Sequence, residues 1–446
     1  MPMEETMTYD KFHFQTAAEL QRRAEELGGY LPASDHPAET LGRAVPVRGT
    51  NAVAKNALAI HPMEGFDSDE NGGPGELTFR RYDRFSTGGA GLFWFEATAI
   101  LPEARSNARQ LYICPENLDG YKRIAEQMHK NSDGAPVIMQ LTHSGRFSRP
   151  TNVPAPLISY HNPVMNEKFN IDPSYPVLTD DYLAALPELF GKATALAKEA
   201  GFDGVDIKAC HRYLLSELLS AYTRENSLYG GSFENRMRLY FDAVRAAAAY
   251  KTDDFLICTR FGAWDVLPFP WGFGGDKEDY LKPDFTEAQA VLSTLSELGV
   301  RLVNITMGSP YVNPHVNRPY DLGGYNPPEH PLTGVMRMIN GTAELKKAHP
   351  EMTFIGTGYT YLRQLAPAVA AGAVEQGMID LAGFGRTAFA YPTFARDALA
   401  DGMKKEKCCI TCGKCTELMR AFTTTGCVVR DAEMYAPIYK AAMEKK

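Results

Sequence analysis

The chain has 446 residues, of which 44% are hydrophobic and 22% charged, so its composition is that of a globular protein and excludes a disordered or fibrous one. Its formal net charge of -8 repels the phosphates of nucleic acids and anionic membranes, and we expect neither as a partner. Because no run reaches the roughly 18 apolar residues of a membrane helix and no secretory signal opens the chain, we expect a cytoplasmic protein.

Short apolar runs recur along the chain, and segments with helical spacing, such as residues 181–200 and 232–250, follow them. Each run is too short for a helix and is typical of a buried parallel strand. The runs are residues 57–60, 91–95, 136–141, 204–207, 255–259, 302–305, 353–355 and 379–382. Eight strands alternating with helices predict an α/β protein and favour a closed (β/α)8 TIM barrel, with an open doubly wound sheet as the alternative.

Two connections are longer than a turn between a strand and a helix requires. Residues 161–179 are rich in Pro and Asn, and residues 263–285 contain Trp264 and Trp271. Loops that follow barrel strands lie on the catalytic face, so these two predict a lid or a substrate wall. The competing interpretation is a packing cover over a helix.

Polar residues follow the predicted strands and would converge on one cavity in a barrel. They are Gln140, His143, Lys208, His211, Tyr213, Arg260 and Asn304. Gly356-Thr357-Gly358 after the seventh strand and Gly385-Arg386 after the eighth indicate a phosphorylated cofactor, because backbone N–H groups at these strand ends commonly bind phosphate.

A helical turn after the fourth strand would place Lys208 and His211 on one face, with Tyr213 nearby. Lysine and histidine can donate hydrogen bonds to an anionic oxygen, and a tyrosine hydroxyl can deliver a proton. The alternative is a histidine at a helix start and a tyrosine in the core.

Five of the eight cysteines lie within residues 408–427. Their spacing is Cys409-x2-Cys412-x2-Cys415-x11-Cys427, with Cys408 as an adjacent spare. Two successive x2 steps and a more distant fourth cysteine indicate thiolate ligation of a [4Fe-4S] cluster. Structural zinc, which more usually shows two separate pairs, and free thiols are the alternatives.

Several motifs together resemble the Old Yellow Enzyme family of FMN-dependent ene-reductases, and more narrowly its iron–sulfur branch, which contains 2,4-dienoyl-CoA reductase and trimethylamine dehydrogenase. The most specific are Gln-Leu-Thr-His-Ser-Gly-Arg at residues 140–146 and Tyr-Gly-Gly-Ser-Phe-Glu-Asn-Arg at residues 229–236. His-Pro-Met at residues 61–63, Phe-Asp-Gly-Val-Asp at residues 202–206 and the cysteine tail also match. The resemblance implies a TIM barrel over residues 1–400, with an N-terminal lead, and an iron–sulfur tail over residues 401–446 packed on it.

The resemblance also implies a set of FMN contacts. These would be Pro62 and Met63 against the flavin ring, Glu64 and Ala97 close by, Gln140 at the pyrimidine edge, Arg260 near N1, and Gly358, Gly385 and Arg386 at the phosphate. A fixed positive charge near N1 stabilises the anionic reduced flavin.

For the reaction, the resemblance implies NAD(P)H as electron donor and hydride transfer from flavin N5 to the β-carbon of an α,β-unsaturated carbonyl compound. Lys208 and His211 would hold the carbonyl oxygen, and Tyr213 would protonate the α-carbon. The family usually has His at the position of Lys208 and His or Asn at the position of His211. It usually has Gly at the position of Arg212, and the arginine of this chain could favour an anionic substrate. The aromatic loops suggest a flat, flavonoid-like or cinnamoyl-like enone.

Two other functions remain open at this point. An amine dehydrogenase or demethylase of the trimethylamine dehydrogenase type would use Tyr213, His211 and Asp265 near the amine. An electron-transfer subunit would relay charge to a partner, and a homo-oligomer is equally compatible with the sequence. No Gly-x-Gly-x-x-Gly fingerprint follows Cys427, so we expect no FAD or pyridine-nucleotide domain in this chain.

Overall fold

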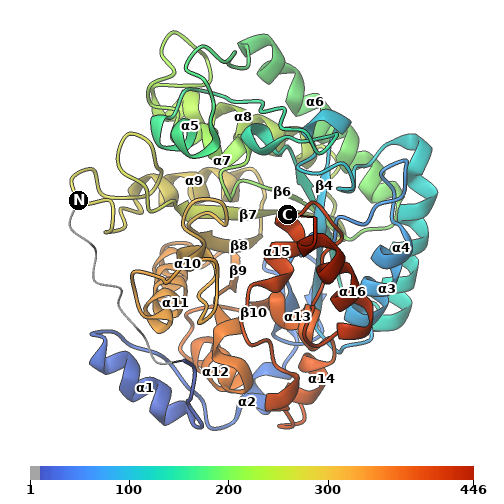
Figure 1. The fold of residues 1–446 in the computed structure, drawn as a ribbon, viewed down its shortest axis with the longest axis vertical. Helices are drawn as coiled ribbons and strands as arrows, with labels where there is room; N and C mark the ends of the chain where they lie inside the picture. The colour runs from blue at the N-terminus through green and yellow to red at the C-terminus, as the bar shows by residue number, and fades with distance from the viewer. Residues whose placement is uncertain (1–10, 446) are drawn as a thin grey trace.

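Eight parallel strands close into a barrel in the order β10-β3-β4-β5-β6-β7-β8-β9 (Figure 1). The computed structural model describes residues 11–445. The strands are β3 (Leu58–Ile60), β4 (Leu92–Ala99), β5 (Val137–Thr142), β6 (Gly204–Ile207), β7 (Leu256–Trp264), β8 (Leu302–Met307), β9 (Thr353–Gly356) and β10 (Leu381–Phe384). Every predicted strand overlaps one of these, so the closed barrel is confirmed and the open sheet is wrong.

Helices surround the barrel and bury its outer surface (Figure 1). The longer ones are α3 (Glu76–Ser86), α4 (Leu118–Ser132), α6 (Asp180–Glu199), α8 (Phe233–Ala248), α9 (Thr286–Glu297), α11 (Pro331–Ala348) and α12 (Ala366–Glu375). The predicted helices at residues 181–200 and 232–250 are α6 and α8. Thr179 and Ser232 cap them by accepting hydrogen bonds from the backbone N–H groups of Tyr182 and Asn235.

An apolar layer fills the interior of the barrel at the amino ends of its strands. A short hairpin of β1 (Val45–Pro46) and β2 (Val53–Ala54) packs against this layer. The buried members are Val47, Ala54, Ala59, Leu92, Trp94, Ile138, Leu256, Cys258, Leu302, Ile355 and Leu381. The polar side chains of the barrel interior therefore lie toward the carboxyl ends of the strands.

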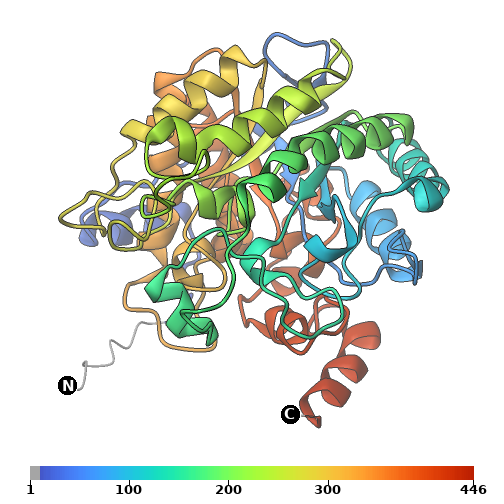
Figure 2. The ribbon, with the colours of Figure 1, turned by 90° about the horizontal axis from the view of Figure 1, so that it is seen from above.

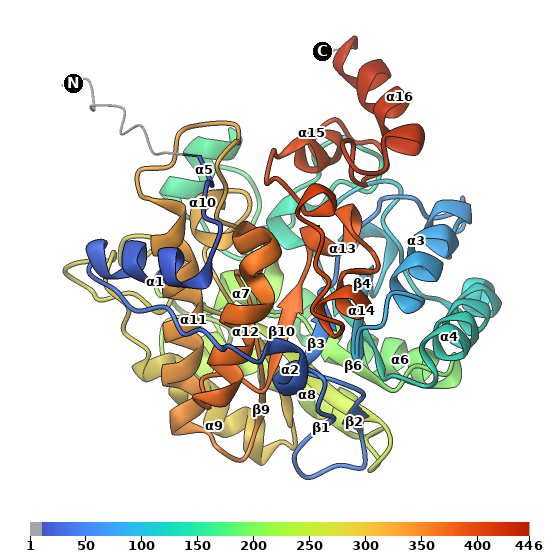
Figure 3. The same cartoon turned by 90° about the horizontal axis from the view of Figure 1, so that it is seen from below.

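The C-terminal tail lies against the loop that follows β3. The backbone N–H of Thr425 donates to the carbonyl of Gly65 at 2.7 Å, and Arg80 forms an ion pair with Asp431 at 2.8 Å. The tail contains α15 (Lys414–Arg420) and α16 (Ala432–Met443), and α16 projects from the body of the molecule (Figures 2 and 3). Within residues 11–445, no helix has both the length and the apolar stretch that crossing a bilayer requires.

A buried ion pair between Arg146 and Glu217 joins the loop after β5 to α7 (Leu214–Leu218). Both side chains are fully buried. Arg146 also donates to Asn166 Oδ1 at 2.6 Å, and Glu217 accepts from the Ser159 hydroxyl at 2.8 Å. Because all these groups are withdrawn from water, loss of either charge leaves the other without compensation.

We predict that Glu217→Ala destabilises the fold by about 3–5 kcal/mol, because it strands the Arg146 guanidinium in the interior. The shift in the urea unfolding midpoint measures the effect. Glu199→Ala is the matched control: it removes the exposed 2.9 Å ion pair with Lys122 and should change stability by less than about 1 kcal/mol. Equal shifts in the two variants would contradict the prediction.

Candidate active site

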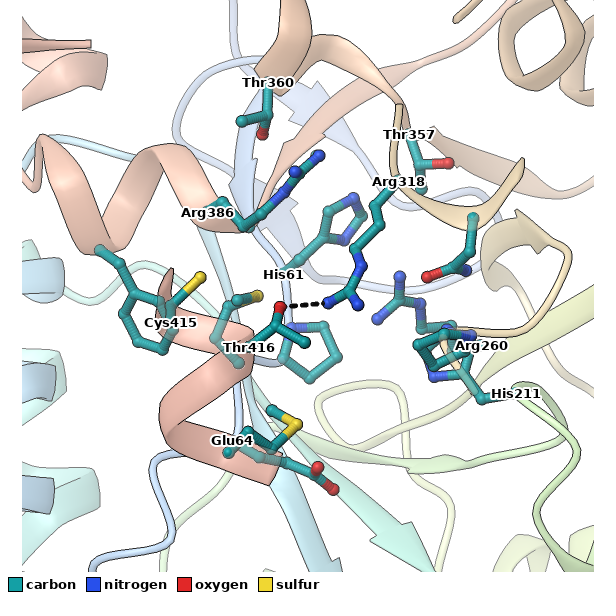
Figure 4. Close-up of a pocket in the computed structure, with 18 of the residues that line it drawn as sticks. His61, Glu64, His211, Arg260, Arg318, Thr357, Thr360, Arg386, Cys415 and Thr416 are labelled. Atoms are coloured by element: carbon teal, nitrogen blue, oxygen red, sulfur yellow. Dashed lines mark hydrogen bonds between the residues drawn. The ribbon is translucent and has the colours of Figure 1, made fainter. Parts of the chain in front are cut away.

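A cavity opens at the carboxyl ends of the barrel strands, where barrel enzymes place their active sites (Figure 4). Its empty volume, including the open mouth, is about 1150 Å³. Residues from the loops after the strands line most of it. Cys415, Thr416, Met419 and Thr425 show that the tail contributes a further wall.

The cavity brings together most of the predicted site residues, but Ala97, His143 and Asn304 do not line it. Those that line it are Pro62, Met63, Glu64, Gln140, Lys208, His211, Tyr213, Arg260, Gly358, Gly385 and Arg386. Ala97 instead is fully buried in β4, where its carbonyl accepts a hydrogen bond from Gln110 Nε2 at 3.1 Å. Its expected place close to a flavin stays a prediction.

The segment that carries Lys208, His211 and Tyr213 does not form the expected helical turn. His211 and Arg212 have φ angles of 64° and 63°, in the left-handed region that is uncommon for side chains other than glycine. Helix α7 begins only at Leu214, with Tyr213 as its N-cap. The prediction that a helical turn places Lys208 and His211 on one face is therefore wrong, although both side chains line the cavity.

Lys208 lies at the centre of a cluster of polar and aromatic groups. Its Nζ is 3.9 Å from Glu64 Oε1 and 3.9 Å from the centre of the Tyr213 ring. Burial raises the pKa of Glu64, while the positive charges of Lys208 and Arg260 oppose that rise. The cavity thus holds a buried ammonium beside one carboxyl group.

The Tyr213 hydroxyl lies 2.9 Å from the hydroxyl of Tyr311, a residue that no sequence pattern indicated. Tyr311 stacks on Phe147 with ring centres 3.9 Å apart. Burial and the charge of Glu64 raise the pKa of Tyr213 well above its usual value of 10. The phenol therefore keeps its proton at neutral pH and can donate it.

One end of the cavity is strongly basic. Arg318 and Arg386 line it, and burial together with the charges of Arg386 and Arg420 lowers the pKa of Arg318 to about 10. The Arg318 guanidinium donates to Thr416 Oγ1 at 2.6 Å (Figure 4). In the described part of the chain, none of these three arginines has a carboxylate partner within ion-pair distance, so an anionic group fits this end.

Several buried polar atoms of the cavity have no partner within residues 11–445. They are His61 Nε2, His211 Nε2 and Arg260 Nε. Unpaired buried polar atoms are costly, and a polar ligand in the cavity would satisfy these. With apolar Pro62 and Met63 on the same cavity and arginines at its end, the residues fit FMN, whose ring has a polar edge and whose side chain ends in a phosphate.

The tail cysteines lie near one another. Burial raises the pKa of Cys409 to about 12, and the neighbouring Cys415 and Cys427 thiols add to that rise. In the part of the chain that the structure describes, no three His, Cys, Asp or Glu side chains are arranged to hold a single metal ion. The thiolates of a cluster stand further apart than those around one ion, because several iron and sulfide atoms lie between them. The predicted cluster is therefore not established by this geometry.

Arg212 and Asp265 pair with each other in the interior and do not line the cavity. Arg212 Nη1 is 2.7 Å from Asp265 Oδ2, and Arg212 also donates to Ser220 Oγ at 2.6 Å. Since Asp265 compensates the charge of Arg212, the structure gives no support to attraction of an anionic substrate by Arg212. Asp265 likewise does not line the cavity in which an amine would bind.

The two long loops do not form the expected substrate wall. Trp264 and Phe273 of residues 263–285 are buried in the core, and Asn162 Nδ2 donates to the Trp271 carbonyl at 2.9 Å. Neither residues 161–179 nor residues 263–285 line the cavity. Residues 310–319 after β8 form a wall in their place.

Comparison with known proteins gives a family. The model of the NADH:flavin oxidoreductase / NADH oxidase family matches residues 46–406. A curated relative, the NADH oxidase of Thermoanaerobacter brockii, is 25% identical over 407 residues, which are 89% of this chain and 57% of that protein. The chain thus spans little more than half the length of this relative.

Solved structures support the fold. A 2-naphthoyl-CoA reductase complex has a TM-score of 0.71 at 19% identity, covering 88% of this chain and 57% of that one. Histamine dehydrogenase from Rhizobium sp. 4-9 has a TM-score of 0.68 at 19% identity, with 88% and 52% covered. The Old Yellow Enzyme homologue from Zymomonas mobilis has a TM-score of 0.58 at 20% identity, with 80% and 91% covered. The chain belongs to the NADH:flavin oxidoreductase / NADH oxidase family, the family of Old Yellow Enzyme.

Proposed function

We propose that this chain binds FMN in the cavity and acts as an NAD(P)H-dependent reductase of the C=C bond of α,β-unsaturated carbonyl compounds. The observation that carries the proposal is that Lys208, His211 and Tyr213 converge on the same cavity as the unpartnered polar atoms and the basic end. When bound, FMN takes electrons from NAD(P)H and supplies hydride to the substrate.

Lys208 and His211 would hold the carbonyl oxygen of the substrate. Negative charge grows on this oxygen during reduction, and the buried Lys208 ammonium stabilises it more strongly than water would. Burial and the charges of Arg260 and Lys208 lower the pKa of His211 well below 6.5, so its ring is neutral. A neutral imidazole can still donate from Nε2, the atom that lacks a protein partner.

Tyr213 would deliver the proton that completes the reduction at the α-carbon. Its hydroxyl is protonated at neutral pH. The Tyr311 hydroxyl lies 2.9 Å away and could return a proton to it. Tyr311 is partly exposed and lines the cavity.

We propose a flat, aromatic substrate such as a flavonoid-like or cinnamoyl-like enone, because aromatic side chains outside the two long loops line the cavity. Tyr213, Tyr311 and Phe389 give it an aromatic lining. The 2-naphthoyl-CoA reductase compared above binds an aromatic acyl thioester, which is in keeping with this class of substrate.

We also propose that Cys409, Cys412, Cys415 and Cys427 bind a [4Fe-4S] cluster. The support is their spacing and the mutual influence of their thiols on one another's pKa. Electron transfer to a separate partner would be a further use of such a cluster.

The decisive experiment is anaerobic mixing of purified protein with NADH or NADPH, followed by enones or amines, with the flavin absorbance recorded. An ene-reductase is reduced by the nucleotide and reoxidised by an enone. Bleaching of the oxidised flavin by amines, without reoxidation by enones, would favour an amine dehydrogenase instead. Absence of enone-dependent NAD(P)H oxidation by the isolated chain would favour an electron-transfer subunit.

We predict that Tyr213→Phe slows enone-dependent turnover by about 10²–10⁴-fold, because it removes the general acid, while FMN stays bound and its reduction by NAD(P)H is unchanged. Stopped-flow measurement of both half-reactions separates the two steps. Tyr182→Phe removes a phenol that contacts His143 outside the cavity and serves as the control. Full turnover of Tyr213→Phe at saturating enone would refute its role.

For the tail, we predict that anaerobically purified protein carries the iron of one [4Fe-4S] cluster per chain and that Cys427→Ser loses most of it, because a thiolate ligand is removed. Iron assay and visible absorption measure the loss. Cys114→Ser, which changes a free thiol outside the tail, should keep the iron content of the wild type. Zinc in place of iron would overturn the cluster.

A further inference from the structure

Asp206 is a buried carboxylate beneath the cavity, and three groups from neighbouring strands donate to it. Gln140 Nε2 and Trp94 Nε1 reach its Oδ2 at 2.6 Å and 2.7 Å, and the backbone N–H of Arg260 reaches its Oδ1 at 2.6 Å. The side chain is fully buried in β6, and its partners come from β4, β5 and β7. Two of them, Gln140 and Arg260, also line the cavity.

The carboxylate fixes the direction of the Gln140 amide. An ionised aspartate only accepts hydrogen bonds, so the amide nitrogen must face it and the amide oxygen must face the other way. No donor within residues 11–445 contacts Gln140 Oε1 at hydrogen-bond distance. Burial raises the pKa of Asp206 to about 6, so the group is ionised at neutral pH. An acceptor is therefore presented to the cavity.

We infer that Asp206 is a positioning residue for the cofactor: it locks the Gln140 amide with its oxygen toward the cavity, where that oxygen accepts from the ring N–H of the flavin. The same carboxylate anchors the backbone of Arg260, a second expected flavin contact. This inference rests on the proposed binding of FMN. It assigns a role in cofactor recognition to a residue that does not itself line the cavity.

Asp206→Asn tests the inference because it keeps the shape of the side chain and changes one acceptor into a donor. Three donors then face one oxygen and one NH2 group. Gln140 can relieve the conflict by rotating its amide, which turns an N–H toward the N–H of the flavin. Losing a hydrogen bond and creating a pair of opposed donors should weaken FMN binding by about tenfold or more.

The experiment is titration of the apoprotein with FMN, followed by fluorescence, in wild type, Asp206→Asn, Gln140→Met and the double variant. If Asp206 acts through Gln140, Asp206→Asn weakens FMN binding in the wild-type background. In the Gln140→Met background it should change the dissociation constant of FMN by less than about twofold. The midpoint potential of the bound flavin should follow the same pattern. Equal effects in both backgrounds, or no effect of Asp206→Asn, would overturn the inference.

Two further variants separate positioning from general loss of structure. Trp94→Phe removes one donor from the same Oδ2 and leaves the Gln140 contact, so FMN affinity should stay within about twofold even if the melting temperature falls.

The second variant exchanges the two groups, as Asp206→Asn with Gln140→Glu. The new amide donates to the new carboxylate, whose other oxygen is an acceptor toward the cavity, so FMN binding should recover. If the exchanged pair folds but does not bind FMN more tightly than Gln140→Met, the inference is contradicted. This test remains valid even if Asp206→Asn alone does not fold. Failure of the wild type to bind FMN would refute the proposed function instead.

Discussion

Closure of the parallel barrel is the constraint on which the rest of this structure depends. Eight strands that run in one direction and return to their starting point must direct all their carboxyl ends at a single space. Gln140, Lys208, Arg260 and Arg386 are far apart in the sequence, yet all four line one cavity. Gln140 and Arg260 lie within β5 and β7, and Lys208 and Arg386 follow the ends of β6 and β10. The chemistry of the site is therefore a consequence of topology.

The tail adds a wall to the cavity of the barrel, and buried ion pairs stabilise the contact between tail and barrel. Arg81 is paired with both Asp67 and Glu96, and Glu96 accepts the backbone N–H of Gly65 at 2.7 Å. The carbonyl of Gly65 in turn accepts from Thr425 of the tail. Burial raises the pKa of Glu96 to about 7, although the Arg81 charge opposes that rise. The loop after β3 is thus held by Glu96 of the barrel and by Thr425 of the tail, and it positions the tail residues beside the cavity.

The sequence predicted the strands well because parallel barrel strands are short, apolar throughout and bounded by polar residues. The same rule found most of the cavity lining, since that lining follows the strand ends. It missed Tyr311 and Arg318, which lie in the connection after β8 and reach the cavity only because of how that connection folds back. It misplaced the aromatic loop at residues 263–285, because composition does not tell an inward tryptophan of the core from one that faces a ligand. The left-handed His211 and Arg212 had no local signal either.

The apolar layer and the hairpin beneath it have a consequence for the timing of catalysis. Val47, Ala54 and Trp94 close the amino end of the barrel, so the cavity has its mouth on the opposite side only, among the described residues. If the cavity binds FMN as proposed, a nucleotide and an enone would both have to enter from that side. Under the proposed function, a cavity closed at its base would favour alternation, with the nucleotide leaving before the enone enters.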